Sequence, residues 1–253
     1  MRLLMIRHGD PDYVHDSLTE KGWREARLLR DRLIQEKIDY FYCSPLGRAR
    51  ATARPTLEAL GRTAEICGWL REFDGSVTNP TTGAPRRAWD QLPSFVNEHD
   101  EFFDRDKWKK TPFFANSDVP EKYDMVCREL DALLARHGYV HEGHLFRVTH
   151  ENTDTIAFFC HYGVECVLLS HLLSIPPVAL WQGCVALTTS VTTLHTEERV
   201  QGIASLRCCG FSDVSHLYAG GEPASFQARF CEVYSNFDER HGDNDQDKVG
   251  KPQ

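Results

Sequence analysis

The chain has 253 residues, 41% hydrophobic and 26% charged, enough to bury one large core or two small ones. Its net charge of −8 disfavours nucleic acid and anionic membrane as partners, because both bind basic surfaces. We also expect no signal peptide and no membrane span, since the apolar stretches are short or interrupted. Nine cysteines without a C-x-x-C pair, several of them in apolar runs, indicate reduced thiols and a cytoplasmic protein.

The first seventy residues alternate between strand and helix patterns. Residues 2–6 predict a buried strand, and 19–36 predict an amphipathic helix with Thr19 as its N-cap. A strand is expected at 39–45, then a helix that Pro55 should bend or restart, then a strand at 64–70. This β-α-β-α-β order predicts a three-layer α/β fold, with a mostly parallel central sheet flanked by helices.

The later segments extend this sheet. Residues 73–125, rich in aromatic residues and proline, predict a helical insertion over the C-terminal edge of the sheet. Residues 145–150 and 155–161 resemble strands paired around the turn "ENTD", and 164–173 a buried helix. A hairpin is expected from two alternating stretches at 190–198 and 202–210. We expect one domain over 1–237, with 73–125 as a substrate cap, and a disordered acidic tail at 238–253.

The end of the first strand carries residues that a fold alone does not require. Arg7, His8 and Gly9 follow the apolar run directly, and ligands of open α/β sheets bind beyond the carboxyl ends of the strands. A histidine there can be a nucleophile, an acid or base, or a metal ligand. The tripeptide alone is equally consistent with an incidental Arg-His pair at a packed strand end.

Two more strand ends favour a site for phosphate. Ser44 ends the second strand, and Arg48 opens the next helix, where free N–H groups and an arginine attract anions. His161 and Gly163 end a later strand in "FFCHYG". If these ends converge on one crevice, they form a phosphate pocket on an acidic protein.

With these motifs in order, the sequence resembles the histidine phosphatase superfamily, with its phosphoglycerate-mutase-like fold, and its broad-specificity phosphatases in particular. The R-H-G signature is residues 7–9, the L-T-x-x-G element is 18–22, and the S-x-L-x-R-A-x-x-T-A element is 44–53. The second histidine motif is His161-Tyr162-Gly163, where the family commonly has Ser-His-Gly-Gly. The resemblance spans about residues 1–218, and the ten-residue element is its most specific part.

The resemblance implies a role for each matching residue. His8 would attack phosphorus and carry a phosphohistidine, and charge repulsion from Arg7 and Arg48 should lower its pKa. Arg7, Arg48 and His161 would surround the phosphoryl oxygens and stabilise the transition state. No metal and no cofactor are then expected, because these side chains supply the positive charge.

The resemblance places the proton donor just after the third strand, where the chain has Glu72. Asp74 and Asp10 are the alternative donors. An apolar neighbour such as Phe73 can raise the pKa of a carboxyl group enough to keep it protonated. A solvated loop carboxylate is the other interpretation of Glu72.

A second group of histidines raises the question of a metal site. His137, His141 and His144 have nearly the spacing of metal ligands, but two glycines weaken any helix that would hold them on one face. We therefore predict a polar loop, and we interpret His171 as a hydrogen-bonded core residue.

The leading hypothesis is a metal-independent phosphomonoesterase acting on a small phosphorylated metabolite. The alternative is a cofactor-dependent phosphoglycerate mutase, which must also bind the substrate carboxylate. In that family's mutases a basic residue follows the acid, whereas here none follows Glu72 until Arg86, which favours hydrolysis. A non-catalytic phospho-ligand-binding domain is less expected, because all four core residues are present. The sequence does not identify the substrate, and it does not decide between a monomer and a homodimer.

Overall fold

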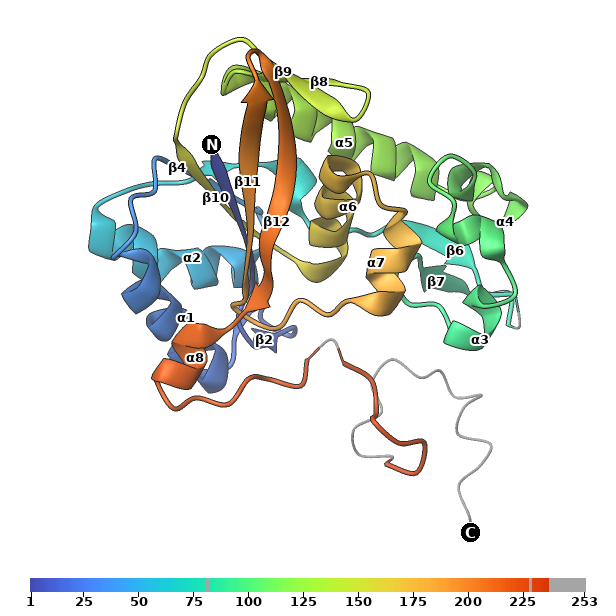
Figure 1. Cartoon of the computed structure of the whole chain (residues 1–253). Helices are drawn as coiled ribbons and strands as arrows, with labels where there is room; N and C mark the ends of the chain where they lie inside the picture. The colour runs from blue at the N-terminus through green and yellow to red at the C-terminus, as the bar shows by residue number, and fades with distance from the viewer. Residues whose placement is uncertain (81, 228, 237–253) are drawn as a thin grey trace.

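The computed structural model describes residues 1–236 except 81 and 228 (Figure 1). Residues 237–253, which include the predicted tail at 238–253, lie outside the described part. No helix among the described residues is long and apolar enough to cross a membrane.

An eight-stranded mixed sheet forms the centre of the molecule, in the order β5-β4-β10-β1-β11-β12-β9-β8. β5, β4, β10 and β1 are paired in parallel, and the remaining neighbours are antiparallel, so only β11 and β9 run against the other strands. Most strands therefore point one way, as predicted. The bounds are β1 (Arg2–Arg7), β4 (Tyr40–Cys43), β5 (Glu65–Ile66), β8 (Tyr139–Glu142), β9 (Leu145–Val148), β10 (Thr155–Cys160), β11 (Val191–Val200) and β12 (Ile203–Asp213).

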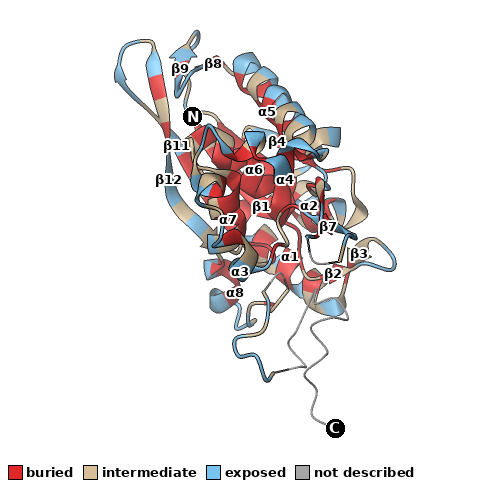
Figure 2. Ribbon diagram, turned by 90° about the vertical axis from the view of Figure 1, so that its right-hand side faces the viewer, coloured by how far each residue is buried: buried red, intermediate tan, exposed pale blue. Residues whose placement is uncertain are grey.

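Helices cover both faces of this sheet (Figure 1). One face carries α1 (Glu20–Leu33), α2 (Gly47–Leu60) and α8 (Ser215–Ala219), and the other carries α5 (Val119–Arg136), α6 (Tyr162–Leu173) and α7 (Pro177–Gly183). The side chains of β1 alternate between the two cores: Leu3 and Met5 pack on the side of α5 and α6, and Leu4 and Ile6 on the side of α1 and α2. The central strands are consequently buried on both faces (Figure 2).

The predicted insertion is a set of short elements beside α7 and α5 (Figure 1). It contains α3 (Pro93–Val96), α4 (Pro112–Ala115) and the 3-10 turns Asp100–Phe103 and Trp108–Lys110, held together by a buried aromatic cluster of Phe102, Trp108 and Phe114. It also contains an unpredicted hairpin, β6 (Ser76–Thr78) and β7 (Pro85–Arg87). A second small hairpin, β2 (Pro11–Asp12) and β3 (Ser17–Leu18), follows β1.

Several boundaries differ from the sequence prediction. The strands around "ENTD" do not pair with each other: β9 pairs with β8 and β12, whereas β10 lies between β1 and β4. Every residue of β10 is buried. This is typical of a central strand in a parallel sheet that helices cover on both faces, whereas a hairpin with one face in solvent would show alternating burial. The strand expected at 64–70 ends at Ile66 and continues as a 3-10 turn, Gly68–Leu70. Pro55 lies inside α2 and does not restart it, because the helix is continuous from Gly47 to Leu60.

Candidate active site

Three neighbouring strands bring the predicted residues to one edge of the sheet. Arg7 lies opposite Cys160 in the parallel pairing of β1 with β10, and Phe159 lies opposite Cys43 in the pairing of β10 with β4. The residue that follows each strand therefore leaves the sheet at the same edge. These residues are His8, His161 and Ser44.

His8 is 2% exposed, and its ring is oriented by the backbone. Its Nδ1 lies 2.8 Å from the carbonyl oxygen of Gly9. Because a carbonyl only accepts hydrogen bonds, we assign the proton to Nδ1, which leaves the lone pair on Nε2. Burial holds the pKa of His8 well below its usual range, and the charges of Arg7 and Arg48 lower it further. The sequence predicted this direction from the arginines, but burial is the larger cause.

His161 lies beside His8, with ring centroids 5.0 Å apart. Its Nε2 is 2.8 Å from the Ser44 hydroxyl, which already accepts the N–H of Leu46. The hydroxyl hydrogen is thus available to Nε2, and we assign the ring proton to Nδ1. Burial and the nearby His8 hold the pKa of His161 well below its usual range. Nδ1 is buried without a hydrogen-bond partner among the described residues, so it can donate to a ligand.

Both arginines are held by a few contacts that leave other N–H groups available. Arg7 Nη1 donates to the carbonyl oxygens of Ala186 at 2.7 Å and Gln227 at 3.1 Å. Arg48 Nη1 donates to the Asp16 carboxylate at 2.8 Å. The Nε of each arginine is buried and has no partner in the described part of the chain. A buried N–H without a partner costs free energy, and an anion bound between the two guanidinium groups would remove that cost.

Asp16 is a positioning residue that the sequence analysis missed. Its backbone has a φ of 45°, in the left-handed region, and its carboxylate accepts hydrogen bonds from the N–H of Gly47 at 2.6 Å and from Arg48. Gly47 is required there because a Cβ atom would lie 2.0 Å from the Asp16 carbonyl oxygen. No local pattern could have revealed this contact, which joins residues 32 apart.

Glu72 lies at the same edge. Its Oε1 accepts the N–H of Phe73 at 2.9 Å and of Gly163 at 2.8 Å. Burial raises the pKa of Glu72, against the opposing effects of Arg7 and the backbone N–H donors. Glu72 and Arg7 line one cavity of about 450 Å³.

The two alternative proton donors are engaged elsewhere. The Asp74 side chain is 60% exposed and pairs with Lys122 at 2.8 Å. Asp10 Oδ2 accepts the hydroxyl of Thr19 at 2.6 Å, and its Oδ1 accepts the hydroxyl of Ser225. Neither aspartate lines the cavity that holds Glu72.

A second buried carboxyl group, Glu165, lies one turn into α6. Burial raises the pKa of Glu165 to about 7, although the Thr192 hydroxyl and Arg7 lower it. In its protonated form this group does not neutralise Arg7, whose charge stays available to an anion. The sequence analysis missed it because it reads as part of an apolar helix.

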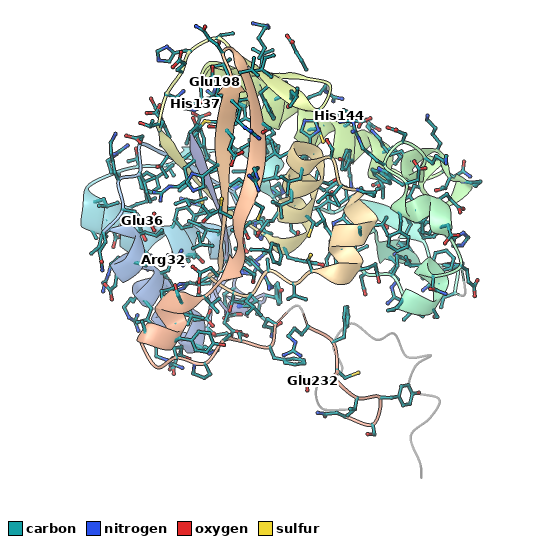
Figure 3. All side chains as sticks on the ribbon, viewed as in Figure 1. Arg32, Glu36, His137, His144, Glu198 and Glu232 are labelled. Atoms are coloured by element: carbon teal, nitrogen blue, oxygen red, sulfur yellow. The ribbon has the colours of Figure 1, made fainter. Side chains whose placement is uncertain are left out.

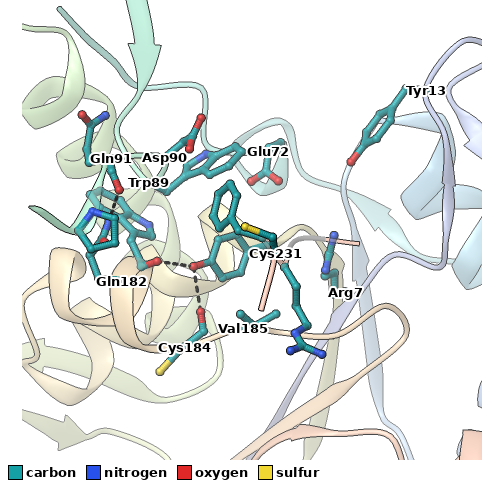
Figure 4. Close-up of a pocket in the computed structure, with 15 residues that line it drawn as sticks. Arg7, Tyr13, Glu72, Trp89, Asp90, Gln91, Gln182, Cys184, Val185 and Cys231 are labelled. Carbon is teal, nitrogen blue, oxygen red and sulfur yellow. Dashed lines mark hydrogen bonds between the residues drawn. The ribbon is translucent and has the colours of Figure 1, made fainter. Parts of the chain in front are cut away.

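Aromatic side chains form part of the remaining cavity wall, beside polar residues such as Gln91 and Gln182 (Figure 4). Of the aromatic residues only Trp89 belongs to the predicted substrate cap at 73–125, which also contributes Asp90, Gln91 and Pro93. Others come from α6, α7 and the C-terminal segment, which sequence patterns did not connect to the site. The aromatic lining residues are Tyr13, Trp89, Tyr162, Trp181 and Phe230, joined by Arg229 and Cys231 from the C-terminal segment.

The three histidines at 137–144 do not converge. His137 contacts the Tyr42 hydroxyl at 2.8 Å, and it is well separated from His144 (Figure 3). His141 instead lies beside His171, and both rings contact the Asp131 carboxylate. Within the described ranges these are the residues arranged to hold a metal ion, and they do not border the cavity of Arg7 and Glu72.

Comparisons with known proteins identify the family to which the sequence is similar. Residues 3–208 match the sequence model of the histidine phosphatase superfamily (branch 1). The adenosylcobalamin/alpha-ribazole phosphatase of Salmonella typhi is 25% identical over 198 residues, covering 73% of this chain and 88% of that protein. The probable phosphoglycerate mutase GpmB of Photorhabdus laumondii is 25% identical over 228 residues, covering 87% and 86%.

Solved structures match the fold. A phosphoserine phosphatase mutant of Entamoeba histolytica, in complex with phosphoserine, superposes with a TM-score of 0.55 at 19% identity, covering 85% of this chain and 98% of that one. A mycobacterial glucosyl-3-phosphoglycerate phosphatase with inorganic phosphate gives 0.53 at 22% identity, with the same coverage. These matches confirm the predicted α/β fold.

Proposed function

The chain belongs to the histidine phosphatase superfamily, and from this premise we propose that it is a metal-independent phosphomonoesterase with His8 as nucleophile. The observation that carries the proposal is the orientation of His8, whose Nδ1–H is bound to Gly9 while Nε2 is unprotonated beside two arginines. The phosphatases among the relatives support it.

The reaction has two steps. Nε2 of His8 attacks phosphorus, the bond from phosphorus to the leaving oxygen breaks, and protonated Glu72 gives its proton to that oxygen. A water molecule then attacks phosphorus, the bond between phosphorus and Nε2 of His8 breaks, and the Glu72 carboxylate takes a proton from the water. Phosphate leaves, and His8 and Glu72 return to their starting states.

Positive charge and N–H donors stabilise the transferring phosphoryl group. Arg7 and Arg48 each have a buried Nε–H to donate, and His161 has its Nδ1–H. Because these groups are already fixed by Ala186, Asp16 and Ser44, little reorganisation accompanies the reaction. No step in this mechanism requires a metal or a cofactor.

The substrate is a small phosphorylated metabolite, and hydrolysis is favoured over mutase activity. A mutase would need basic residues near Glu72 for a second anion. The first arginines after it are turned to other partners: Arg86 donates to Asp90, and Arg87 donates to the carbonyl oxygen of Asp74 at 2.6 Å. Neither lines the cavity.

Replacing the nucleophile tests the proposal. We expect His8→Ala to abolish phosphate release from p-nitrophenyl phosphate, measured with and without a chelator, and to abolish an acid-labile, base-stable phosphoenzyme. His195→Ala, at an exposed position of β11, is the matched control and should retain both. Substantial activity in a folded His8→Ala protein would contradict the assignment, and loss of wild-type activity with chelator would contradict metal independence.

A further inference from the structure

One part of the wall of the cavity beside Glu72 is aromatic, and the polar atoms of its rings are bound by the protein. The indole N–H of Trp89 donates to the carbonyl oxygen of Phe73 at 3.0 Å, and that of Trp181 donates to Gly163 at 3.3 Å. The hydroxyl of Tyr162 contacts the carbonyl oxygens of Trp181 at 2.7 Å and Cys184 at 3.0 Å (Figure 4). With these polar atoms bonded to the protein, the rings offer a ligand mainly apolar surface.

The aromatic wall is also preformed. Trp181 stacks on Phe73 with centroids 5.6 Å apart and meets Trp108 edge-on at 6.4 Å. Trp89 meets Tyr162 edge-on at 6.0 Å. Rings held by such contacts lose little entropy when a ligand binds against them, so the wall favours a flat ligand over a flexible one.

Charge in the cavity does not favour a second anion. Besides Arg7, which faces the phosphoryl group, the lining has one basic residue, Arg229, and this side chain is bound to Glu232 at 2.6 Å and stacked over Phe226. Glu72 and Asp90 add carboxyl groups. Glu72 is protonated in the proposed mechanism, and Asp90 is paired with Arg86. A carboxylate on the leaving group would therefore lie against aromatic rings, and Arg229, already paired with Glu232, would not be free to neutralise it, which is costly.

The volume of about 450 Å³ lies in the range of pockets that enclose whole ligands, and a three-carbon leaving group would leave much of it empty. We propose that the leaving group of the natural substrate is an uncharged, flat aromatic group, bound against the wall formed by Trp89, Tyr162 and Trp181 while the phosphoryl group lies at His8. This inference rests on the proposed phosphatase activity.

The test compares substrates that all release a primary alcohol, so that leaving-group chemistry is matched. These are 2-naphthylmethyl phosphate, n-butyl phosphate and 3-phosphoglycerate, assayed by phosphate release with the full chain. We expect kcat/KM for the naphthylmethyl ester to exceed the other two at least tenfold, because ring stacking and apolar burial favour it. Equal or greater kcat/KM for 3-phosphoglycerate would overturn the inference.

Substitution of the wall locates the effect. Trp89→Ala should raise KM for naphthylmethyl phosphate about tenfold and change KM for butyl phosphate less than twofold, whereas Trp89→Phe should restore most of the difference. Trp69→Ala is the matched control, since Trp69 is also partly buried but packs near Phe158, away from the cavity. Equal effects of Trp89→Ala on both substrates would overturn the inference.

Failure of this inference differs from failure of the proposed function. If all three esters are hydrolysed by a His8-dependent route without aromatic preference, only the inference falls. If His8→Ala leaves hydrolysis intact, the proposed function falls. In that case, competitive binding of 2-naphthylmethylphosphonate and of n-butylphosphonate to the wild type tests the pocket directly. Tighter binding of the aromatic compound supports the inference of an aromatic leaving group, and equal binding overturns this inference.

Discussion

At the scale of single residues, the site pairs two groups whose pKa values are displaced in opposite directions. Burial lowers the pKa of His8 and raises that of Glu72. Both changes favour the neutral form, so an unprotonated nucleophile and a protonated acid can coexist in one pocket. A histidine and a glutamate with their reference pKa values would instead both be mostly charged at about pH 5 to 6.

Replacement of Glu72 separates its role from simple packing. Glu72→Gln should keep the hydrogen bonds from Phe73 and Gly163 but cannot donate the catalytic proton. We expect kcat for an alkyl phosphate to fall by about 10²- to 10⁴-fold, the usual contribution of general acid catalysis. The loss should be smaller for p-nitrophenyl phosphate, whose phenolate leaves without a proton.

The pH profile gives an independent check on the same residue. Because Glu72 must be protonated to act, kcat for alkyl phosphates should fall as pH rises through its raised pKa, and this decline should be absent from the residual activity of Glu72→Gln. Asp74→Asn, at the exposed position paired with Lys122, is the control. If Asp74→Asn instead slows alkyl phosphates much more than p-nitrophenyl phosphate, the proton donor is Asp74.

Sequence patterns indicated most of the proposed catalytic residues, but few of the residues that position them. His8 follows a strand end and Arg48 lies at the start of a helix, whereas Glu72 follows the 3-10 turn Gly68–Leu70, where the sequence predicted the end of a strand. Their roles stay predictions until the variants are measured. Asp16 and Trp89 contribute through contacts across the fold, so no spacing in the sequence could mark them.

At the scale of elements, the start of α6 joins the acid to the aromatic wall. A Cβ atom on Gly163 would lie 2.7 Å from Glu72 Oε1 and 2.7 Å from Trp89 Cδ1. The same residue donates its N–H to Glu72. Glycine at this position therefore allows the helix, the proton donor and the ring to meet without a side chain between them.

Gly163→Ala should displace Glu72 and Trp89 together. We expect kcat/KM for an alkyl phosphate to fall by about 10- to 100-fold, as for small misplacements of catalytic groups, with a loss of stability of about 1–3 kcal/mol from overpacking. Gly183→Ala, at the end of α7, is the matched control because no atom lies within 4 Å of its added Cβ. Unchanged kinetics in Gly163→Ala would contradict this account.

Elements were predicted best where local pattern decides them. Thr19 caps α1 by accepting the N–H of Gly22, as its position before an amphipathic run predicts. The prediction that β10 pairs with the strand before "ENTD" was wrong, because an apolar run indicates that a strand is buried but not which strand lies beside it. The β6–β7 hairpin was missed because its strands have only three residues each.

At the scale of the whole molecule, the last part of the chain that the structure describes lies against the elements that follow β1 and reaches the site. The segment 222–236 crosses the N-terminal elements: Glu222 pairs with Lys21 at 2.6 Å and with Arg24 at 2.9 Å. Further along, the carbonyl oxygen of Gln227 accepts a hydrogen bond from Arg7. This segment then supplies Phe230 to the cavity wall, so its attachment affects the substrate pocket.

Glu222→Ala removes two ion pairs from the anchor of this segment. We expect faster limited proteolysis within 222–236 and a several-fold higher KM for naphthylmethyl phosphate, with kcat little changed, because the cavity loses part of its wall. Glu36→Ala is the matched control: Glu36 also pairs with two basic residues, Arg2 and Arg32, but away from the cavity. The same KM in both variants would show that the anchor does not influence binding.

The central position of β1 has a consequence for how the protein is made. Its two neighbours, β10 and β11, begin at Thr155 and Val191, so the first strand leaves the ribosome long before either partner exists. At 5–20 residues per second, this apolar strand waits for roughly ten seconds or more. During that time it is exposed to aggregation, and chaperones that bind apolar segments would protect it. His8, the proposed nucleophile, is thus synthesised well before β10 and β11, and its pocket is assembled only after both of these strands have been translated.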